Sequence, residues 1–251
     1  MATTEGCHPW VALLALVVIV YFSVRNWLWI LSMPVPEGPT SGGYLGVRAR
    51  LWYRQLMQPL EDAFVAAAIG PNAITYSQTA LAAAAGLAFA SGAMFLGGWL
   101  VIAAGTLDVL DGGVARRTEQ SSPRGAFVDS VVDRYAELLT HAGLAYYFRS
   151  SWLALVVWLS LFGSLMVSYT RARAEGLGVD CQVGGAQRPE RVVILGFGAF
   201  LSDIVAHVWC AVSGTRSHWL LALTVVVMAV LANVTAVQRA RWVGRRLGGT
   251  R

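Results

Sequence analysis

Four aspartates lie within a short stretch of the chain between apolar segments, with Arg116 at a set position between them, and their spacing points to phosphate chemistry. Asp108 and Asp111 are three residues apart, so they share one face of a helix. Asp129 and Asp133 are four apart and share a face in the same way, and Arg116 lies between the two pairs. Carboxylates bind hard divalent cations and guanidinium groups bind phosphate. The pattern therefore predicts a site for metal ions and a phosphorylated ligand.

Acidic residues at this density between membrane-length apolar segments are costly to place, so a function has to be proposed for them. Gly112 and Gly125 would let the backbone approach a ligand closely from either side of the acids. Structural ion pairs in a helical bundle are the competing interpretation. We favour the ligand site because four acids have too few cations near them to be neutralised.

Long apolar segments are the elements that must position these residues. The chain has 251 residues, of which 56% are hydrophobic and 13% charged, a composition that excludes an ordinary soluble protein. Six segments are close to the roughly 20 residues needed to cross a bilayer. The sequence therefore predicts an all-α integral membrane protein whose six-helix core is formed by residues 72–91, 94–110, 126–148, 152–169, 192–212 and 219–237.

Three features precede this core. Residues 10–31 form another apolar segment, which we expect to be an additional N-terminal transmembrane helix rather than a cleaved signal peptide, because no basic residue precedes it. Residues 33–44 are rich in Pro, Gly and Ser and are typical of a linker. Residues 48–69 mix arginines with aromatic and apolar side chains, which suits an interfacial helix and equally one that caps the bundle.

The distribution of arginine predicts the orientation in the membrane. The formal net charge is +5, and every basic side chain is an arginine. Arginines concentrate before the core, beside the acids, after the fourth core helix and at the C-terminus, whereas the alternate connections hold few. The positive-inside rule then places both ends of the core and the acids on the cytoplasmic side. Nothing forms a soluble basic face, so we expect membrane lipid and not nucleic acid as the partner.

The cysteines suggest no further chemistry. Cys7, Cys181 and Cys210 form no CxxC pair and no metal-ligand spacing. Neither a disulfide nor a zinc site is predicted.

The acidic pattern, D-x2-D-G-x2-A-R-x8-G-x3-D-x3-D, resembles the signature of the CDP-alcohol phosphotransferases, and every position of that signature is filled. These are membrane enzymes that displace CMP from a CDP-linked lipid with an alcohol hydroxyl. The resemblance implies two divalent ions, Mg²⁺ or Mn²⁺, at Asp108, Asp111, Asp129 and Asp133. It also implies that Asp133 is the general base for the attacking hydroxyl. A homodimer is expected from the resemblance alone.

The same resemblance implies which residues contact the nucleotide. A Pro-Asn-x-x-Thr element opens the first core helix and corresponds to one at the family's nucleotide site. An ordinary helix start is the competing interpretation of its proline and polar cap. The residues expected at the cytidine diphosphate are Asn72, Thr75, Gly112, Ala115, Arg116 and Gly125.

Two compact strings, S-Y-x-x-A-R-A-E and R-P-E-R, resemble the branch of the family that makes phosphatidylinositol phosphate or its ether-lipid counterpart. In that branch the acceptor is inositol phosphate, and serine and arginines hold its phosphate. Ordinary flanking charge at a membrane surface is the alternative. The residues expected at the acceptor are Ser168, Arg171, Arg173 and either Arg188 or Arg191.

A polar stripe continues from the acids along the third core helix. Asp133, Glu137 and His141 repeat at four-residue intervals and so share one face. They could line a pocket for the acceptor alcohol. For His141 a hydrogen-bonded core histidine is the favoured interpretation, and for Glu137 a structural ion pair is equally plausible.

These observations predict an enzyme that transfers a phosphatidyl group from CDP-diacylglycerol, or a similar CDP-lipid, to inositol phosphate in the cytoplasmic membrane. Glycerol 3-phosphate as acceptor is the alternative within the family, and a cation-coupled transporter is a remote one. The expected organisation is a helix and linker over residues 1–44, a membrane domain over 45–238 and a basic cytoplasmic tail over 239–251.

Overall fold

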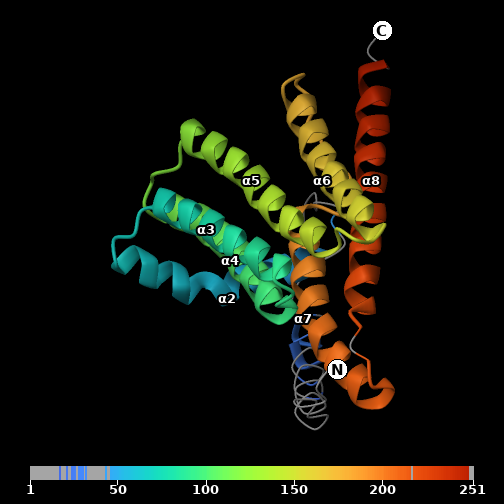
Figure 1. Ribbon diagram of the computed structural model, residues 1–251. Helices are drawn as coiled ribbons and strands as arrows, with labels where there is room; N and C mark the ends of the chain where they lie inside the picture. Colours follow the sequence, from blue (N-terminus) through green and yellow to red (C-terminus); the bar gives the residue numbers. More distant parts are fainter. Residues whose placement is uncertain are drawn as a thin grey trace.

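The computed structural model describes residues 17, 21, 24–26, 28–30, 32, 43, 46–215 and 217–248. These residues contain helices and turns and no strand, which confirms the predicted all-α fold. The long helices, drawn in Figure 1, are α2 (Gly46–Ala66), α3 (Pro71–Ala90), α4 (Met94–Arg117), α5 (Pro123–Tyr147), α6 (Leu153–Glu175), α7 (Arg188–Ser213) and α8 (Trp219–Gly248). The expected N-terminal transmembrane helix and linker fall largely outside the described residues.

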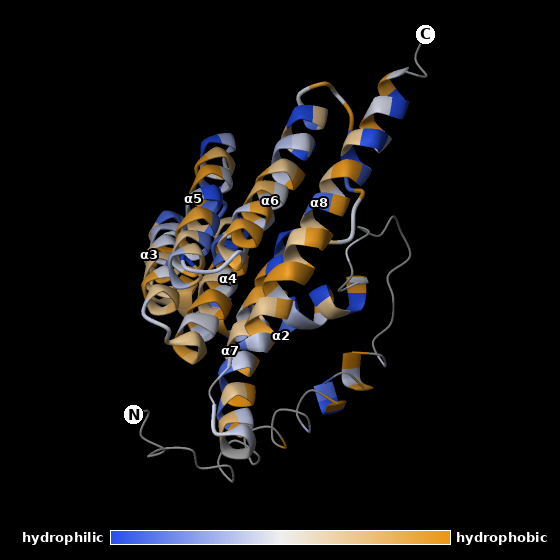
Figure 2. Cartoon of the chain, turned by 45° about the vertical axis from the view of Figure 1, so that its right-hand side comes forward, coloured by the Kyte–Doolittle hydropathy of each residue, from blue (hydrophilic) through white to orange (hydrophobic). Residues whose placement is uncertain are grey.

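Five of these helices, α3, α4, α6, α7 and α8, are long and apolar enough to cross a membrane. Helix α5 has 25 residues, enough to span a bilayer, but it carries the acids of the second half of the pattern among its apolar residues. Figure 2 shows many hydrophobic residues along α6, α7 and α8. The hydrophilic residues of α8 gather toward its C-terminal end. The chain is a multi-pass membrane protein.

Helices α3 to α8 form a closed ring in which each packs on the next. The order around the ring is α3, α4, α7, α8, α6 and α5, and α5 returns to pack on α3. Helix α2 lies outside the ring against α4 (Figure 1). Helix α3 therefore packs against both α4 and α5, which carry the two halves of the acidic pattern.

Local sequence signals fix where the key helices begin. Pro71, Pro123 and Pro189 each lie in the first turn of a helix, where a missing backbone N–H costs no hydrogen bond. Ser122 caps α5, because its hydroxyl accepts a hydrogen bond from the Gly125 N–H at 3.1 Å. The short connection between Arg117 and Pro123 thus sets the end of α4 beside the start of α5.

Helices α3 and α5 approach closely through glycine. A Cβ atom added at Gly143 would collide with the backbone of Gly86. A Cβ atom added at Gly86 would collide in turn with the carbonyl oxygen of Leu139. Small residues at such a crossing let membrane helices pack backbone to backbone.

Helix α2, predicted over residues 48–69, packs onto α4. Buried Met57 belongs to one apolar cluster with Ile74, Leu110 and Val114. Arg117 at the end of α4 forms an ion pair with Glu61 at 3.2 Å and a second one with Asp62. Helix α2 thus packs against the bundle, which is compatible with both interpretations of the sequence, and its interfacial position stays a prediction.

Candidate active site

Three of the four aspartates converge on one point between α4 and α5. Asp108, Asp111 and Asp129 each offer a carboxylate oxygen, and these oxygens all lie within 4.8 Å of one another. The buried Oδ1 of Asp129 has no hydrogen-bond partner among the described residues. A compact set of hard oxygen ligands with a free buried oxygen fits a divalent cation such as Mg²⁺ or Mn²⁺.

The orientation of Asp111 is fixed from two sides. The hydroxyl of Thr75 donates to Asp111 Oδ2 at 2.7 Å, and the Gly112 N–H donates to Oδ1 at 2.6 Å. Asp111 is buried. Thr75 comes from α3, so a helix outside the acidic pattern positions one of its carboxylates. Such supporting hydrogen bonds are a regular feature of metal sites.

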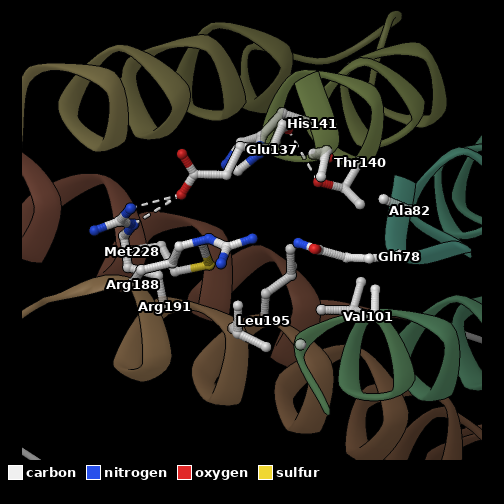
Figure 3. A pocket seen from close by; sticks show the side chains of 14 residues that line it. Gln78, Ala82, Val101, Glu137, Thr140, His141, Arg188, Arg191, Leu195 and Met228 are labelled. Carbon is white, nitrogen blue, oxygen red and sulfur yellow. Dashed lines mark hydrogen bonds and ion pairs between the residues drawn. The ribbon is translucent and has the colours of Figure 1, made fainter. Parts of the chain in front are cut away.

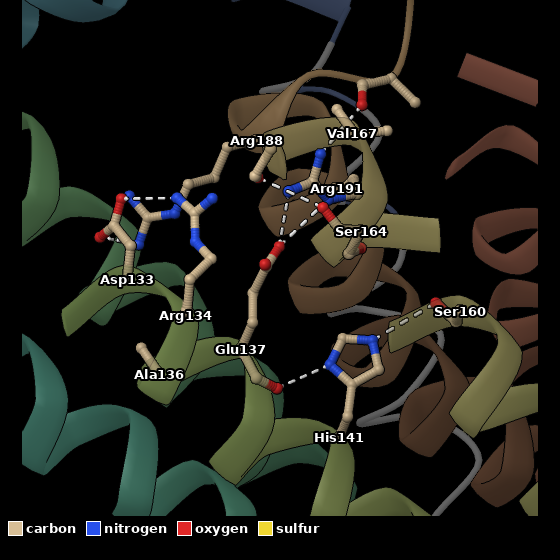
Figure 4. Close-up of polar contacts among 12 residues, drawn as sticks. Asp133, Arg134, Ala136, Glu137, His141, Ser160, Ser164, Val167, Arg188 and Arg191 are labelled. Atoms are coloured by element: carbon tan, nitrogen blue, oxygen red, sulfur yellow. Dashed lines mark hydrogen bonds and ion pairs between the residues drawn. The ribbon is translucent and has the colours of Figure 1, made fainter. Parts of the chain in front are cut away.

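Asp133 lies apart from the three-acid group and is surrounded by donors. Its Oδ1 accepts a hydrogen bond from Gln78 at 3.1 Å and forms an ion pair with Arg188 at 2.6 Å. Among the described residues, the polar contact of its Oδ2 is a long one, at 3.4 Å, with Arg134 (Figure 4). Asp133 is 6% exposed, so this environment is almost closed to solvent.

Arg188, at the start of α7, connects the two halves of the acidic pattern. One guanidinium nitrogen pairs with Asp108 on α4 and the other with Asp133 on α5. The bidentate geometry of arginine suits such bridging between carboxylates. The nearby cation that the sequence appeared to lack is therefore supplied by a helix that begins 55 residues after Asp133.

A small cavity lies in the middle of the helix ring, next to the acids. It has a volume of about 40 Å³, room for a few water molecules. Its polar lining includes Gln78, Glu137, His141, Arg188 and Arg191 (Figure 3). Apolar residues of α4, α7 and α8 close the remaining sides.

The polar stripe on α5 is explained by its contacts. Glu137 Oε1 accepts two hydrogen bonds from Arg191, at 2.6 and 3.1 Å, so it pairs with α7. His141 is buried, and its ring nitrogens contact the Glu137 carbonyl at 2.8 Å and the Ser160 hydroxyl at 3.3 Å. The favoured interpretation of His141 as a hydrogen-bonded core residue is confirmed, and both side chains also line the cavity.

The residues expected at the nucleotide occupy different surroundings. Asn72 and Arg116 are exposed at the ends of α3 and α4, where a bound molecule could reach them. The guanidinium of Arg116 lies over Gly112, since a Cβ atom added there would be 3.3 Å from it. Gly125 and Ala115 are partly buried. These residues lie on α3, α4 and α5, which carry the acids or hydrogen-bond to them, and their contact with a nucleotide stays a prediction.

The residues expected at the acceptor divide into two sets. Arg171 and Arg173 are exposed at the end of α6, where Arg171 pairs with Glu175 at 2.8 Å. Ser168 bonds within its own helix, to the Ser164 carbonyl at 3.2 Å. Arg188 and Arg191, by contrast, turn inward and pair with the acids of α5.

Sequence reasoning missed two residues that the structure brings to this region. Gln78 is 1% exposed and one helical turn after Thr75, a spacing that could have indicated it. Arg239, assigned to the tail, is 3% exposed, and its guanidinium donates to the carbonyls of Val167 at 2.7 Å and Val183 at 2.6 Å. Its four-residue spacing from buried Thr235 was the available signal.

Helix α2 adds a tyrosine next to the acids. The Tyr53 hydroxyl lies 2.6 Å from the Thr106 hydroxyl, two residues before Asp108. Burial raises the pKa of Tyr53 above its ordinary value, and the nearby charge of Asp108 adds to the rise. Tyr53 is therefore a neutral hydrogen-bonding group at physiological pH.

Comparison with known proteins identifies the family of this site. The sequence profile of the CDP-alcohol phosphatidyltransferases matches residues 68–230, which include the whole ring except the end of α8. The chain belongs to the CDP-alcohol phosphatidyltransferase family. It is therefore an enzyme of phospholipid biosynthesis, a transferase embedded in a membrane, and the resemblance seen in the acidic pattern is confirmed.

Two known proteins resemble the chain over most of their length. It is 35% identical to the archaetidylinositol phosphate synthase of Methanothermobacter thermautotrophicus, over 77% of this chain and 91% of that protein. It is 31% identical to the phosphatidylinositol phosphate synthase of Mycobacteroides abscessus, over 77% of this chain and 86% of that protein.

Solved structures of the family share the fold. The phosphatidylinositol phosphate synthase of Mycobacterium tuberculosis with CDP-DAG bound superposes with a TM-score of 0.62 at 25% identity, over 75% of this chain and 94% of that one. A structure of the same enzyme in complex with manganese and citrate gives a TM-score of 0.61 at 25% identity, over 74% and 88%.

Proposed function

We propose that the protein transfers a phosphatidyl group, or a similar lipid-phosphate group, from a CDP-lipid to the hydroxyl of inositol phosphate and releases CMP. The observation that carries this proposal is the convergence of Asp108, Asp111 and Asp129 on one point beside buried Asp133. The names of the relatives support inositol phosphate as the acceptor, because both the archaeal and the bacterial relative are inositol phosphate lipid synthases.

The metal site of this reaction would be formed by the acids. Asp108, Asp111 and Asp129 would hold Mg²⁺ or Mn²⁺, and Asp133 would complete the position of a second ion. The manganese in the solved mycobacterial enzyme supports this assignment. When bound, the ions would neutralise the diphosphate and stabilise the departing CMP. Thr75 would keep Asp111 in place through its 2.7 Å hydrogen bond.

Asp133 would act as the general base. The acceptor hydroxyl oxygen attacks the lipid-side phosphorus, the bond from that phosphorus to the oxygen bridging the diphosphate breaks, and CMP leaves with the electron pair. The hydroxyl proton passes to Asp133. Its Oδ2 suits this role because Gln78 and Arg188 occupy Oδ1, whereas Oδ2 has only the 3.4 Å contact with Arg134.

The two substrates would bind to residues of α3 to α7 close to the acids. The donor nucleotide would lie against Asn72, Thr75, Gly112, Ala115, Arg116 and Gly125, and the CDP-DAG bound to the mycobacterial enzyme supports a CDP-lipid donor. The acceptor phosphate would lie near exposed Arg171 and Arg173, with Ser168 and either Arg188 or Arg191.

The arrangement in the membrane belongs to the same proposal. Helices α3 to α8 would be six spans, α5 included, with a seventh span before residue 44 and α2 along the interface. The membrane domain would cover residues 45–238 and a basic tail residues 239–251. The acids would face the cytoplasm across the cell membrane. The working form would be a homodimer, as expected for the family.

Release of CMP by the purified, detergent-solubilised protein tests the function. CDP-diacylglycerol and Mg²⁺ or Mn²⁺ are supplied, with inositol phosphate, glycerol 3-phosphate, free inositol and serine offered in parallel. We expect release that requires inositol phosphate and is abolished by EDTA. Release with glycerol 3-phosphate instead would retain the mechanism and replace the acceptor. Release that survives EDTA would contradict the metal site.

A further inference from the structure

We propose that Arg188 is an exchangeable counter-ion of the acid site, which competes with a divalent cation for Asp108 and moves into the central cavity when the cation binds. This inference rests on the metal site of the proposed function. The family resemblance gives Arg188 only as a candidate for binding the acceptor, and the exchange would be an additional role.

The first argument is that Arg188 and the expected cation share a ligand. Asp108 belongs to the three-acid group, and its Oδ1 is also the partner of an Arg188 guanidinium nitrogen. The other nitrogen holds Asp133 Oδ1 at 2.6 Å, and the Arg188 side chain is 17% exposed. A guanidinium and a dication on one carboxylate that is largely shielded from water repel each other strongly.

The second argument is that the guanidinium has a place to go. Arg188 lines the central cavity, and its Nε has no hydrogen-bond partner among the described residues. Glu137 lines the same cavity, and its buried Oε2 also lacks a partner there, since Arg191 uses only Oε1. A buried carboxylate oxygen without a donor is costly, and Arg188 would satisfy it.

The two positions keep the charges balanced. With Arg188 on Asp108 and Asp133, the arginine offsets the repulsion among the acids. With a cation on the acids, Arg188 moves toward Glu137, which then faces Arg188 and Arg191 together. The cavity of about 40 Å³ provides space for part of this movement. Cation affinity is thus lowered by the free energy needed to displace the arginine.

Direct Mn²⁺ binding tests the exchange without any assay of turnover. Titration calorimetry or Mn²⁺ electron paramagnetic resonance on the intact detergent-solubilised protein gives the Kd. We expect Arg188→Gln to bind Mn²⁺ about tenfold or more tightly than the wild type, since close charge pairs couple at this level or above. The matched control is Arg124→Gln, which removes the same charge from an exposed position at the start of α5. It should change the Kd by less than about twofold.

A conservative variant covers the case in which Arg188→Gln does not fold, as judged by size-exclusion chromatography. Arg188→Lys keeps the charge but cannot bridge two carboxylates with one rigid group, so we expect a Kd between those of the wild type and Arg188→Gln. An unchanged or weaker Mn²⁺ affinity in both Arg188 variants would overturn the exchange while leaving the metal site intact. No Mn²⁺ binding by the wild type would overturn the metal site itself.

Discussion

Asp129 and Asp133 lie one helical turn apart on α5, yet their surroundings differ. Asp129 faces two other carboxylates and keeps a free buried oxygen, whereas Asp133 is bound by Gln78 and Arg188. The first environment suits a metal ligand. The second suits a base whose orientation must be fixed before the substrate arrives.

Asp129→Asn should abolish CMP release, with a loss of about a thousandfold or more, because it removes a ligand charge from the centre of the acid group. The same change should leave the protein folded, because Asp129 Oδ1 contributes no hydrogen bond within the described structure. Turnover and thermal unfolding measured on the same preparation check both outcomes. Asp180→Asn, at an exposed loop position, is the control. Normal turnover in Asp129→Asn would remove the metal site.

Gln78→Ala should lower kcat by about ten- to a hundredfold, the usual range for a residue that orients a functional group. The reason is the loss of the 3.1 Å hydrogen bond to Asp133 Oδ1. The KM for the CDP-lipid should change little, because Gln78 is buried and hydrogen-bonds to Asp133, which is not among the residues expected at the nucleotide. Steady-state kinetics with varied donor separate these quantities. An unchanged kcat would show that Arg188 alone orients Asp133.

At the scale of single residues, the sequence alone indicated all four aspartates, because the members of each pair are only three or four residues apart along the chain. It missed Gln78, because the only local signal was its spacing of one helical turn from Thr75, and its partner Asp133 lies on a different helix. It offered either Arg188 or Arg191 as an acceptor residue and did not predict a contact with the acids, because spacing along one chain says nothing about which helix lies across the ring. The bridge from Arg188 to Asp108 required the tertiary packing of α7.

At the scale of elements, hydropathy located the helices but shortened three of them. The apolar segments predicted to end at residues 110, 169 and 237 belong to helices that continue to Arg117, Glu175 and Gly248. A helix does not stop where its side chains become polar, and hydropathy detects only the part in contact with lipid. The acids of α4 therefore lie inside a helix, which holds them more rigidly than a loop would.

Arg239, near the end of α8, was misjudged because the helix continues beyond its apolar segment. Arg239 lies beyond the apolar segment, but it remains within the helix and on its inner face. Its hydrogen bonds to Val167 and Val183 fasten the connection between α6 and α7 to the ring. Charge composition alone placed it in a solvated tail, since only the three-dimensional structure reveals these carbonyl partners.

Gly143→Ala should destabilise the protein by about 1–3 kcal/mol, the usual cost of inserting atoms into a closely packed contact. The added Cβ would collide with the backbone of Gly86 and push α5 away from α3. Thermal or denaturant unfolding in detergent measures the change. Gly244→Ala on α8 is the control, because a Cβ there meets no atom within 4 Å. It should be neutral or slightly stabilising. Equal stability of both variants would contradict the close α3–α5 contact.

At the scale of the whole molecule, the ring order explains why two helices, α3 and α7, support the acids carried by α4 and α5. Helix α3 packs against α4 and α5, so Thr75 reaches Asp111 on one side and Gln78 reaches Asp133 on the other. Helix α7 closes the opposite side with Arg188. Apolar periodicity predicts how many helices there are, but their order around the ring depends on packing that the sequence does not reveal.

The proposed orientation predicts which connections are accessible from each side of the membrane. In a background without the native cysteines, Ser150→Cys between α5 and α6 should react with a membrane-impermeant maleimide in intact cells. Ser121→Cys, between α4 and α5, should react only after permeabilisation, because it lies at the end of the bundle near the acids. Both serines are exposed, so they differ only in the side they face. The reverse labelling pattern would invert the proposed topology.

The order of the helices along the chain also has a consequence for biogenesis. A ribosome completes α3, α4 and α5 before it begins α7, so the acid group exists in the nascent protein before Arg188 has been synthesised. About 55 residues separate Asp133 from that arginine, which corresponds to several seconds of translation. During that interval the repulsion among the carboxylates opposes the approach of α4 to α5. Insertion of α7 then supplies the missing positive charge, so the step that adds α7 to the ring is also the step that offsets the repulsion among the acids.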